Sequence, residues 1–221
     1  MIAIEGIDGS GKGTQARLLA ERLNALGQAT VTLSFPAYDK PFGKLIGAYL
    51  NGAYGGLDTA PVIPVSMLYA MNRCEVMQNL HALKNAAGKG VGDVVVILDR
   101  YTGSNLAHQG ARLPAGERDE YFEFMEYTEY ELLGLTRPSC TIFLDVDEAT
   151  AHDNVAKKGE RAYTEASHDL HESSAAYMAE VRSVYRALAD KHGWRRIVCS
   201  TGGVMRSAED ISHEVFSRAF F

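Results

Sequence analysis

"IAIEGIDGSGKGTQ", residues 2–15, predicts a short apolar strand that runs directly into a glycine-rich turn. Leucines then recur at helical spacing, and Gly27 supplies a stop for that helix. The spacing G-x-x-x-x-G-K between Gly6 and Lys12 is the Walker A pattern. The backbone N–H groups of such a loop, with the positive end of a helix behind them, attract an anion. We therefore expect the loop to bind the phosphate chain of a nucleotide, with Lys12 reaching the outer phosphates.

The residue after this lysine departs from the Walker A pattern. That position normally carries Ser or Thr, whose hydroxyl binds Mg²⁺. Here it is Gly13, and the hydroxyl comes one residue later, at Thr14. A glycine-rich turn without a ligand is the alternative interpretation. The apolar strand before the turn and the amphipathic helix after it favour a phosphate-binding loop.

The composition is that of an ordinary soluble domain, and it argues against several classes of protein. A length of 221 residues with 46% hydrophobic and 23% charged residues suits one α/β domain. A net charge of −6 argues against a general nucleic-acid binder. Three scattered cysteines without C-x-x-C spacing predict free thiols in a reducing compartment. No apolar run has transmembrane length and the first strand leaves no room for a signal peptide, so we expect a cytoplasmic protein with no membrane partner.

Apolar, β-branched runs predict five strands, and helical patterns fill the intervals between them. The runs lie at residues 2–5, 29–34, 94–98, 141–146 and 196–199. Most are continuously apolar, as in parallel strands that are buried on both faces. We therefore expect one α/β domain over residues 1–221, with a doubly wound, mostly parallel five-stranded sheet and helices on both faces.

Two stretches lack the regular pattern of the predicted helices and strands. Residues 51–64 are rich in Gly and Pro, and residues 157–172 (KKGERAYTEASHDLHE) carry charges of both signs with almost no apolar periodicity. The second stretch is typical of a mobile flap over a binding site.

Two strand ends carry further candidate residues, because ligands of open α/β sheets bind beyond the carboxyl ends of the strands. The strand at 94–98 is followed by Asp99 and Arg100. Arg100 could bind a second phosphate and Asp99 could hold magnesium through water, whereas a surface salt bridge is the alternative. Phe35 and Tyr38 follow the strand at 29–34. They are equally compatible with core aromatics and with walls for a planar ligand.

One predicted helix carries an aromatic residue and an arginine on the same face. Tyr69 and Arg73 are four residues apart, so the ring could stack on a nucleobase while the arginine donates to a carbonyl. A packed tyrosine beside a solvated arginine is the alternative, and it is the commoner arrangement. The aromatic and acidic stretch at 119–133 instead suggests core or subunit interface.

The order of these motifs resembles the thymidylate kinase family. The motifs are EGIDGSGKGTQ, FPAYDKPFGKLIGAYLNG, LYAMNR, DRYTGSNLAHQGAR, IFLDVDEATA and DLHE, and together they extend from residue 1 to about residue 190. The resemblance implies a three-layer P-loop NTPase fold and transfer of the γ-phosphoryl group of ATP to dTMP, giving dTDP. It also implies Mg²⁺ and a homodimer.

The resemblance also assigns roles to individual residues. The ATP phosphates would be held by Gly9, Ser10, Gly11, Lys12, Gly13 and Thr14. The dTMP site would consist of Asp8 at the sugar 3′-hydroxyl, Phe35 and Tyr38 at the phosphate and sugar, Tyr69 on the thymine ring, Arg73 at the base carbonyl, Arg100 at the phosphate, Ser104 and Asn105 at the base, and His108 near the sugar 2′ position.

Catalysis and metal binding are assigned in the same way. The catalytic residues would be Lys12, Arg100, Asp8 and a cation of a lid that spans about residues 154–172. The candidate magnesium residues are Asp8, Thr14, Asp99 and Glu172, where Glu172 and Asp169 match the acidic pair that follows the lid in the family.

The chain departs from the family at four positions, of which Gly13 is the first. Tyr69 adds a hydroxyl to the stacking ring, and His108 replaces an aromatic residue that many relatives carry beside the sugar. Asn154 replaces the arginine that commonly opens the lid helix. Arg161 is our first choice for the missing cation, because a guanidinium matches phosphate oxygens better than an ammonium does. Lys157 and Lys158 are the other candidates.

Two other functions are compatible with a Walker A loop. The acceptor could be another pyrimidine nucleotide or an unphosphorylated deoxynucleoside, although Arg73 and Arg100 together favour a monophosphate. A switch ATPase would bind a protein instead of a small acceptor, and its ATP turnover would not depend on dTMP.

Overall fold

The computed structural model describes residues 1–87, 94–156 and 175–221. The expected flap at 157–172 lies outside the described residues, as do Arg161, Lys157, Lys158, Asp169 and Glu172. Within the described ranges, no helix has the length and apolar character needed to cross a bilayer.

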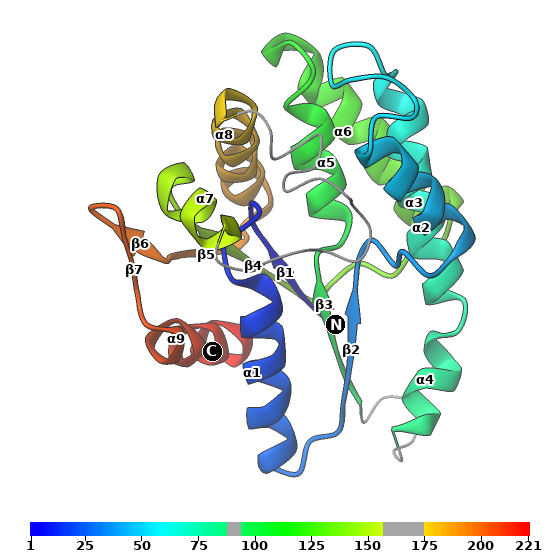
Figure 1. Cartoon of the computed structure of the whole chain (residues 1–221). Helices are drawn as coiled ribbons and strands as arrows, with labels where there is room; N and C mark the ends of the chain where they lie inside the picture. The colour runs from blue at the N-terminus through cyan, green and yellow to red at the C-terminus, as the bar shows by residue number, and fades with distance from the viewer. Residues whose placement is uncertain (88–93, 157–174) are drawn as a thin grey trace.

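A five-stranded sheet forms the centre of the molecule (Figure 1). Its strand order is β2-β3-β1-β4-β5, and all four neighbouring pairs are parallel. The strands are β1 (Ile2–Glu5), β2 (Thr30–Ser34), β3 (Val95–Asp99), β4 (Cys140–Asp145) and β5 (Arg195–Val198). The sequence prediction of a doubly wound parallel sheet is confirmed, with strand boundaries within one residue of those expected.

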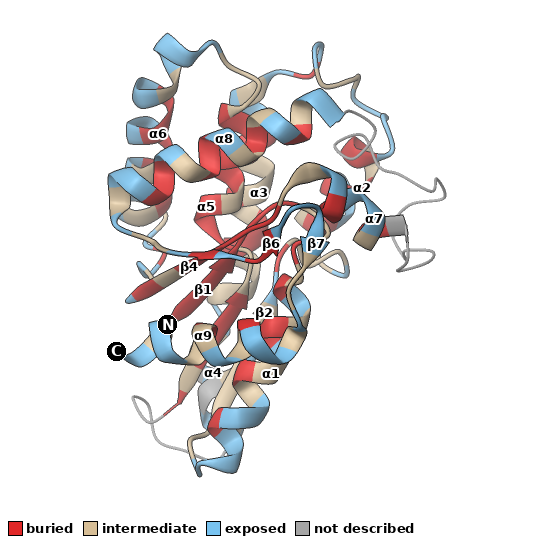
Figure 2. Ribbon diagram, turned by 90° about the vertical axis from the view of Figure 1, so that its left-hand side faces the viewer, coloured by how far each residue is buried: buried red, intermediate tan, exposed pale blue. Residues whose placement is uncertain are grey.

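Helices cover both faces of the sheet (Figure 2). One layer contains α1 and α9, which contact each other, while α5, α8 and α3 pack together in the opposite layer. The helices are α1 (Lys12–Ala25), α2 (Pro41–Leu50), α3 (Val62–Met77), α4 (Leu80–Ala86), α5 (Thr102–Gly110), α6 (Arg118–Glu126), α7 (Glu148–Ala156), α8 (Ala175–His192) and α9 (Ala208–Phe220). Buried apolar residues of the strands and of both helix layers belong to one core cluster, as in a three-layer α/β fold. Figure 2 shows most of the central strands as buried.

Three short elements are absent from the sequence prediction. The first is a short 3₁₀ helix, η1 (Ala115–Glu117). The second is an antiparallel hairpin, in which β6 (Ser200–Thr201) pairs with β7 (Val204–Met205). The third is a π-helical segment, η2 (Tyr127–Leu132), in which the N–H of Leu133 donates to the carbonyl of Thr128. The stretch at 119–133 therefore does not continue as one regular α-helix.

Part of that stretch belongs to the core, as its aromatic pattern suggested. Tyr121, Phe122 and Met125 are buried in the main hydrophobic cluster. Phe124 and Tyr127 are exposed.

The three cysteines are free and buried. Burial raises the pKa of the Cys199 thiol to about 12, so this thiol stays protonated near neutral pH.

Candidate active site

The glycine-rich loop lies between β1 and α1, at the carboxyl edge of the sheet. Gly9 and Gly11 have positive φ angles of 79° and 89°. A Cβ atom on Gly9 would lie 2.0 Å from the carbonyl oxygen of Ala151, so a side chain cannot fit there. Because α1 begins at Lys12, the loop brings the positive end of a helix to the sheet edge.

Asn154 holds this loop from α7. Its Nδ2 donates to the carbonyl oxygen of Gly9 at 3.0 Å. The residue that replaces the family's lid arginine therefore contacts the phosphate loop itself.

Lys12 is buried at the end of the loop. Its Nζ donates to the carbonyl oxygen of Ile7 at 2.7 Å and to Ser10 Oγ at 3.4 Å. Burial, together with the nearby positive charge of Arg100, lowers the pKa of Lys12 to about 7. Without a bound anion, the lysine is therefore partly deprotonated near neutral pH.

We expect ATP binding to draw a proton onto Lys12. Phosphate charge raises the pKa of the ammonium, so uptake is large above pH 7 and falls below it, where Lys12 is already protonated. Calorimetry at pH 8, in buffers of different ionisation enthalpy and at saturating ATP, measures this uptake. Lys12→Met should lose it and the surface variant Lys191→Met should retain it. Equal uptake in wild type and Lys12→Met would contradict the assignment.

Arg100 and Asp8 form an ion pair beside the loop. Arg100 Nη2 and Asp8 Oδ1 are 2.5 Å apart. Arg100 Nη1 also donates to the carbonyl oxygen of Gly6 at 3.3 Å and to Ser104 Oγ at 3.2 Å. Burial alone would lower the pKa of Arg100, but Asp8 and its other neighbours raise it well above the ordinary value, so the guanidinium stays charged.

The backbone of Arg100 is itself unusual. Its φ angle is +67°, in the left-handed region that non-glycine residues seldom adopt. Such a conformation costs about 1–3 kcal/mol and is characteristic of functional sites. It turns the chain sharply at the end of β3.

A buried carboxylate, Glu5, lies at the end of β1 and holds residues next to Arg100. It accepts hydrogen bonds from Ser104 Oγ at 2.5 Å, from the backbone N–H of Tyr101 at 2.8 Å and from Tyr185 Oη at 3.2 Å. Burial raises its pKa. Sequence analysis missed Glu5, although an acidic residue at the end of an apolar strand is a signal that could have found it.

A second buried ion pair lies on α3. Arg73 and Glu129 have side-chain exposures of only 2% and 1%. Arg73 Nε donates to Glu129 Oε2 at 2.7 Å and Arg73 Nη2 donates to Glu129 Oε1 at 2.5 Å. Glu129 belongs to η2, in the stretch that sequence analysis considered only as core or interface. Nothing in its local pattern distinguishes it from the acidic residues around it.

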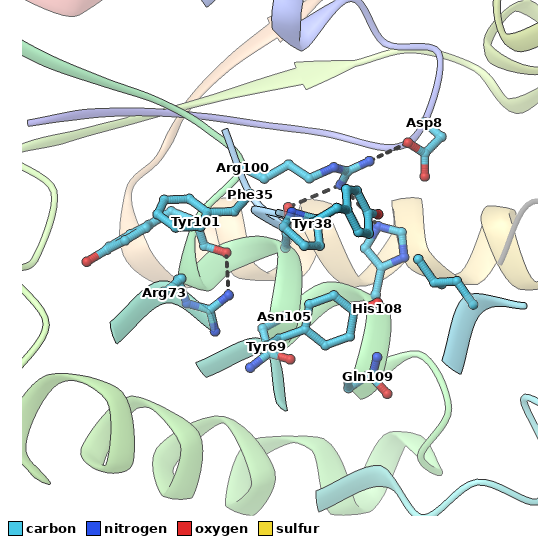
Figure 3. Close-up of a pocket in the computed structure, with 13 residues that line it drawn as sticks. Asp8, Phe35, Tyr38, Tyr69, Arg73, Arg100, Tyr101, Asn105, His108 and Gln109 are labelled. Atoms are coloured by element: carbon cyan, nitrogen blue, oxygen red, sulfur yellow. Dashed lines mark hydrogen bonds and ion pairs between the residues drawn. The ribbon is translucent and has the colours of Figure 1, made fainter. Parts of the chain in front are cut away.

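A pocket of about 540 Å³, including the solvent at its mouth, lies between these two charged centres. Figure 3 shows Asp8 and Arg100 on one side of it and Arg73, Tyr69 and Asn105 on the other. All nine residues that the resemblance assigns to the acceptor nucleotide line this pocket. The complete lining is Asp8, Phe35, Pro36, Tyr38, Leu50, Tyr69, Arg73, Arg100, Tyr101, Ser104, Asn105, His108 and Gln109.

The aromatic wall of the pocket is fixed by a residue that sequence analysis did not consider. Asn72 on α3 accepts from the N–H of Ala37 at 2.8 Å and donates to the carbonyl oxygen of Ala37 at 3.1 Å. These two bonds tie the segment carrying Phe35 and Tyr38 to the helix that carries Tyr69.

Two of the four candidate metal residues, Asp8 and Asp99, lie at the phosphate loop. Asp99 Oδ2 would lie 3.1 Å from a Cβ atom on Gly13, at the start of α1. Asp8 and Asp99 both act on the charge of Lys12. Among the described residues, no three His, Cys, Asp or Glu side chains form a metal cluster. Magnesium commonly binds through one or two carboxylates together with nucleotide phosphates, so this arrangement fits Mg²⁺ that enters with ATP.

Fold and site together define a P-loop kinase, because a glycine-rich loop of Walker A pattern adjoins a second pocket that contains two arginines. Comparison with known proteins narrows this class. A family model described as thymidylate kinase matches residues 4–211. The chain belongs to the thymidylate kinase family and is an enzyme.

Individual relatives cover most of the chain. A thymidylate kinase of Mycobacterium tuberculosis is 32% identical over 195 residues, which are 88% of this chain and 87% of the relative. A probable thymidylate kinase of Thermococcus onnurineus is 33% identical over 218 residues, or 97% of this chain and 94% of the relative. The structure of thymidylate kinase from Candida albicans has the same fold, with a TM-score of 0.71 at 23% identity, covering 98% of this chain and 88% of that one.

Proposed function

We propose that this chain transfers the γ-phosphoryl group of ATP to dTMP, giving dTDP. The observation that carries the proposal is the pocket between Arg100 and Arg73, which has one charged centre beside the phosphate loop and one beside an aromatic ring. A nucleoside monophosphate requires these two features in this order. A switch ATPase has no use for such a pocket, and no observation favours one.

The acceptor phosphate lies against Arg100 in this proposal. Its attacking oxygen is already anionic, so the reaction needs positioning and charge neutralisation rather than a strong base. Lys12 reaches the transferred group from the loop, while Arg100 neutralises the acceptor. Asp8, now paired with Arg100, receives the sugar 3′-hydroxyl.

Asp8, Asp99 and Thr14 would hold Mg²⁺ together with the nucleotide phosphates. The metal supplies charge stabilisation on the phosphate oxygens when it is bound. Arg161 would supply a further cation from the lid, and Glu172 would contribute to the metal site. Both residues belong to the proposal alone, because they lie outside the described residues.

The chain functions as a cytoplasmic homodimer in this proposal. The exposed side chains of Phe124, Tyr127 and Leu132 support an interface that includes the stretch at 119–133.

A coupled assay of ADP release, with and without dTMP, tests the function. We expect turnover to require a nucleoside monophosphate and to be fastest with dTMP in a panel with dUMP, dCMP, dAMP, dGMP and thymidine. ATP turnover that ignores all acceptors would contradict the proposal.

Arg100→Ala should raise the KM for dTMP and lower kcat, while the KM for ATP changes little. Loss of a charge-assisted, bidentate contact costs about 1.5–3 kcal/mol, which is about a 10- to 100-fold effect. Steady-state kinetics with each substrate varied in turn measures the change. Arg17→Ala, at an exposed arginine of α1, is the control. A raised KM for ATP with an unchanged KM for dTMP would show that Arg100 binds the phosphates of ATP and not the acceptor phosphate.

A further inference from the structure

Glu129 sets the hydrogen-bonding pattern at the end of the pocket that contains Arg73, Tyr69 and Asn105. We call this the base end, because the proposed function places the nucleobase there. Glu129 accepts from Arg73 through both carboxylate oxygens, and its Oε1 also accepts from Asn105 Nδ2 at 2.9 Å. One buried carboxylate therefore holds two of the polar side chains that line the pocket. An ionised carboxylate can only accept hydrogen bonds, so both partners must present donors to it.

This constraint determines which atom Asn105 shows to the pocket. Its Nδ2 group is committed twice, to Glu129 and to the carbonyl oxygen of Ser66 at 3.1 Å. Asn105 Oδ1 is buried without a hydrogen-bond partner among the described residues. Because Asn105 lines the pocket, this acceptor is available for a hydrogen bond from a ligand bound there.

Arg73 provides the opposite polarity beside it. A guanidinium carries five N–H donors. Two of these donate to Glu129, and among the described residues Nη1 makes a long contact of 3.5 Å with the carbonyl oxygen of Tyr101 (Figure 3). The base end therefore offers a donor from Arg73 next to an acceptor from Asn105.

We infer that Glu129 is a positioning residue that makes this site selective for 4-keto pyrimidines over 4-amino pyrimidines. Thymine presents a carbonyl acceptor at C4 and an N–H donor at N3, which complement Arg73 and Asn105. Cytosine presents the reverse, an amino donor and a ring-nitrogen acceptor. The inference rests on the proposed function, and it assigns selectivity to a residue that does not line the pocket.

Glu129→Gln should weaken this selectivity, because the amide replaces one acceptor by a donor. If the new N–H group takes the Oε1 position, it faces donors of both Asn105 and Arg73. Asn105 can accept from it only by turning its oxygen toward it, which gives up the bond to Ser66 and presents Nδ2 to the base. If it faces Arg73 Nε, the guanidinium is displaced. Either arrangement fits thymine less well, and the first fits cytosine.

The test compares dTMP with 5-methyl-dCMP, which keeps the methyl group and differs only at this edge. We expect the ratio of kcat/KM for the two acceptors to fall tenfold or more in Glu129→Gln. Glu131→Gln, at an exposed glutamate of the same segment, should keep the wild-type ratio. Glu129→Asp retains the charge that Arg73 needs for folding, but its shorter carboxylate cannot reach both partners, so its ratio should fall as well.

The outcomes separate the inference from the proposed function. If Glu129 only stabilised the fold, its replacement would lower the melting temperature, or kcat for both acceptors. The ratio of kcat/KM for the two acceptors would then stay unchanged. An unchanged ratio in either folded Glu129 variant would overturn the inference while leaving dTMP kinase activity intact. A wild-type enzyme that does not phosphorylate dTMP would overturn the proposed function itself.

Discussion

Lys12→Ala should abolish measurable phosphoryl transfer while the protein remains folded. Lys12 provides charge at the phosphate loop, and removing one preorganised charge or donor from a transition state commonly costs about 100- to 1000-fold in kcat. The same variant should not lose stability. The pKa of Lys12 is lowered to about 7, mainly by burial, so the folded protein without nucleotide disfavours its charged form.

The measurement combines the coupled assay with thermal unfolding of the same preparation. For the ligand-free variant we expect a melting temperature equal to or above that of wild type at pH 7, and a smaller increase on addition of ATP than wild type shows. Lys191→Ala, at a partly exposed lysine, should change neither activity nor the response to ATP. Near-normal turnover in folded Lys12→Ala would contradict the phosphate-loop assignment.

Glu129→Leu should produce the largest loss of stability among single substitutions at the site. Arg73 is 2% exposed, and without Glu129 its charge would remain buried with no carboxylate partner. Breaking a buried ion pair from one side costs about 3–5 kcal/mol. For a chain of this length, that corresponds to a decrease in melting temperature of about 6–20 °C.

The double variant Arg73→Met/Glu129→Leu is the matched control. Replacing a whole buried ion pair by apolar residues of similar volume is often neutral or stabilising. We therefore expect denaturant unfolding to show that the second substitution recovers most of the lost stability, while activity toward dTMP stays low because Arg73 is gone. If the double variant is no more stable than Glu129→Leu, the unpaired arginine is not the cause of the loss.

Local sequence patterns were sufficient to predict the sheet and the phosphate loop. Strands buried on both faces produce continuous apolar runs, and a loop that surrounds phosphate requires glycine at positions of positive φ. Both signals lie within a few consecutive residues. Parallel strands also bring their carboxyl ends to one edge, so the proximity of the loop and Arg100 follows from the fold class alone.

Local patterns did not decide whether Phe35, Tyr38 and Arg73 belong to a binding pocket, and the resemblance to a family assigned them to one. From the residues alone, Phe35 and Tyr38 were equally core or pocket, and a solvated arginine was the commoner interpretation of Arg73. The structure places all three at the pocket. Arg73 is buried rather than solvated, which no periodicity of α3 indicates.

Partners that are distant in sequence were decided only by the tertiary structure. Asp8 pairs with Arg100 across 92 residues, Glu5 holds Ser104 across 99, and Glu129 holds Arg73 across 56. A charged residue on a helix looks the same in sequence whether it faces water or a buried counter-charge. Its role depends on desolvation and on the partner that folding brings to it. The sequence by itself therefore determined the sheet, the phosphate loop and the chemical class of the site, because short-range pattern encodes them. The tertiary structure alone decided which carboxylates orient the site's arginines and amide, because that pairing exists only once the helices have packed.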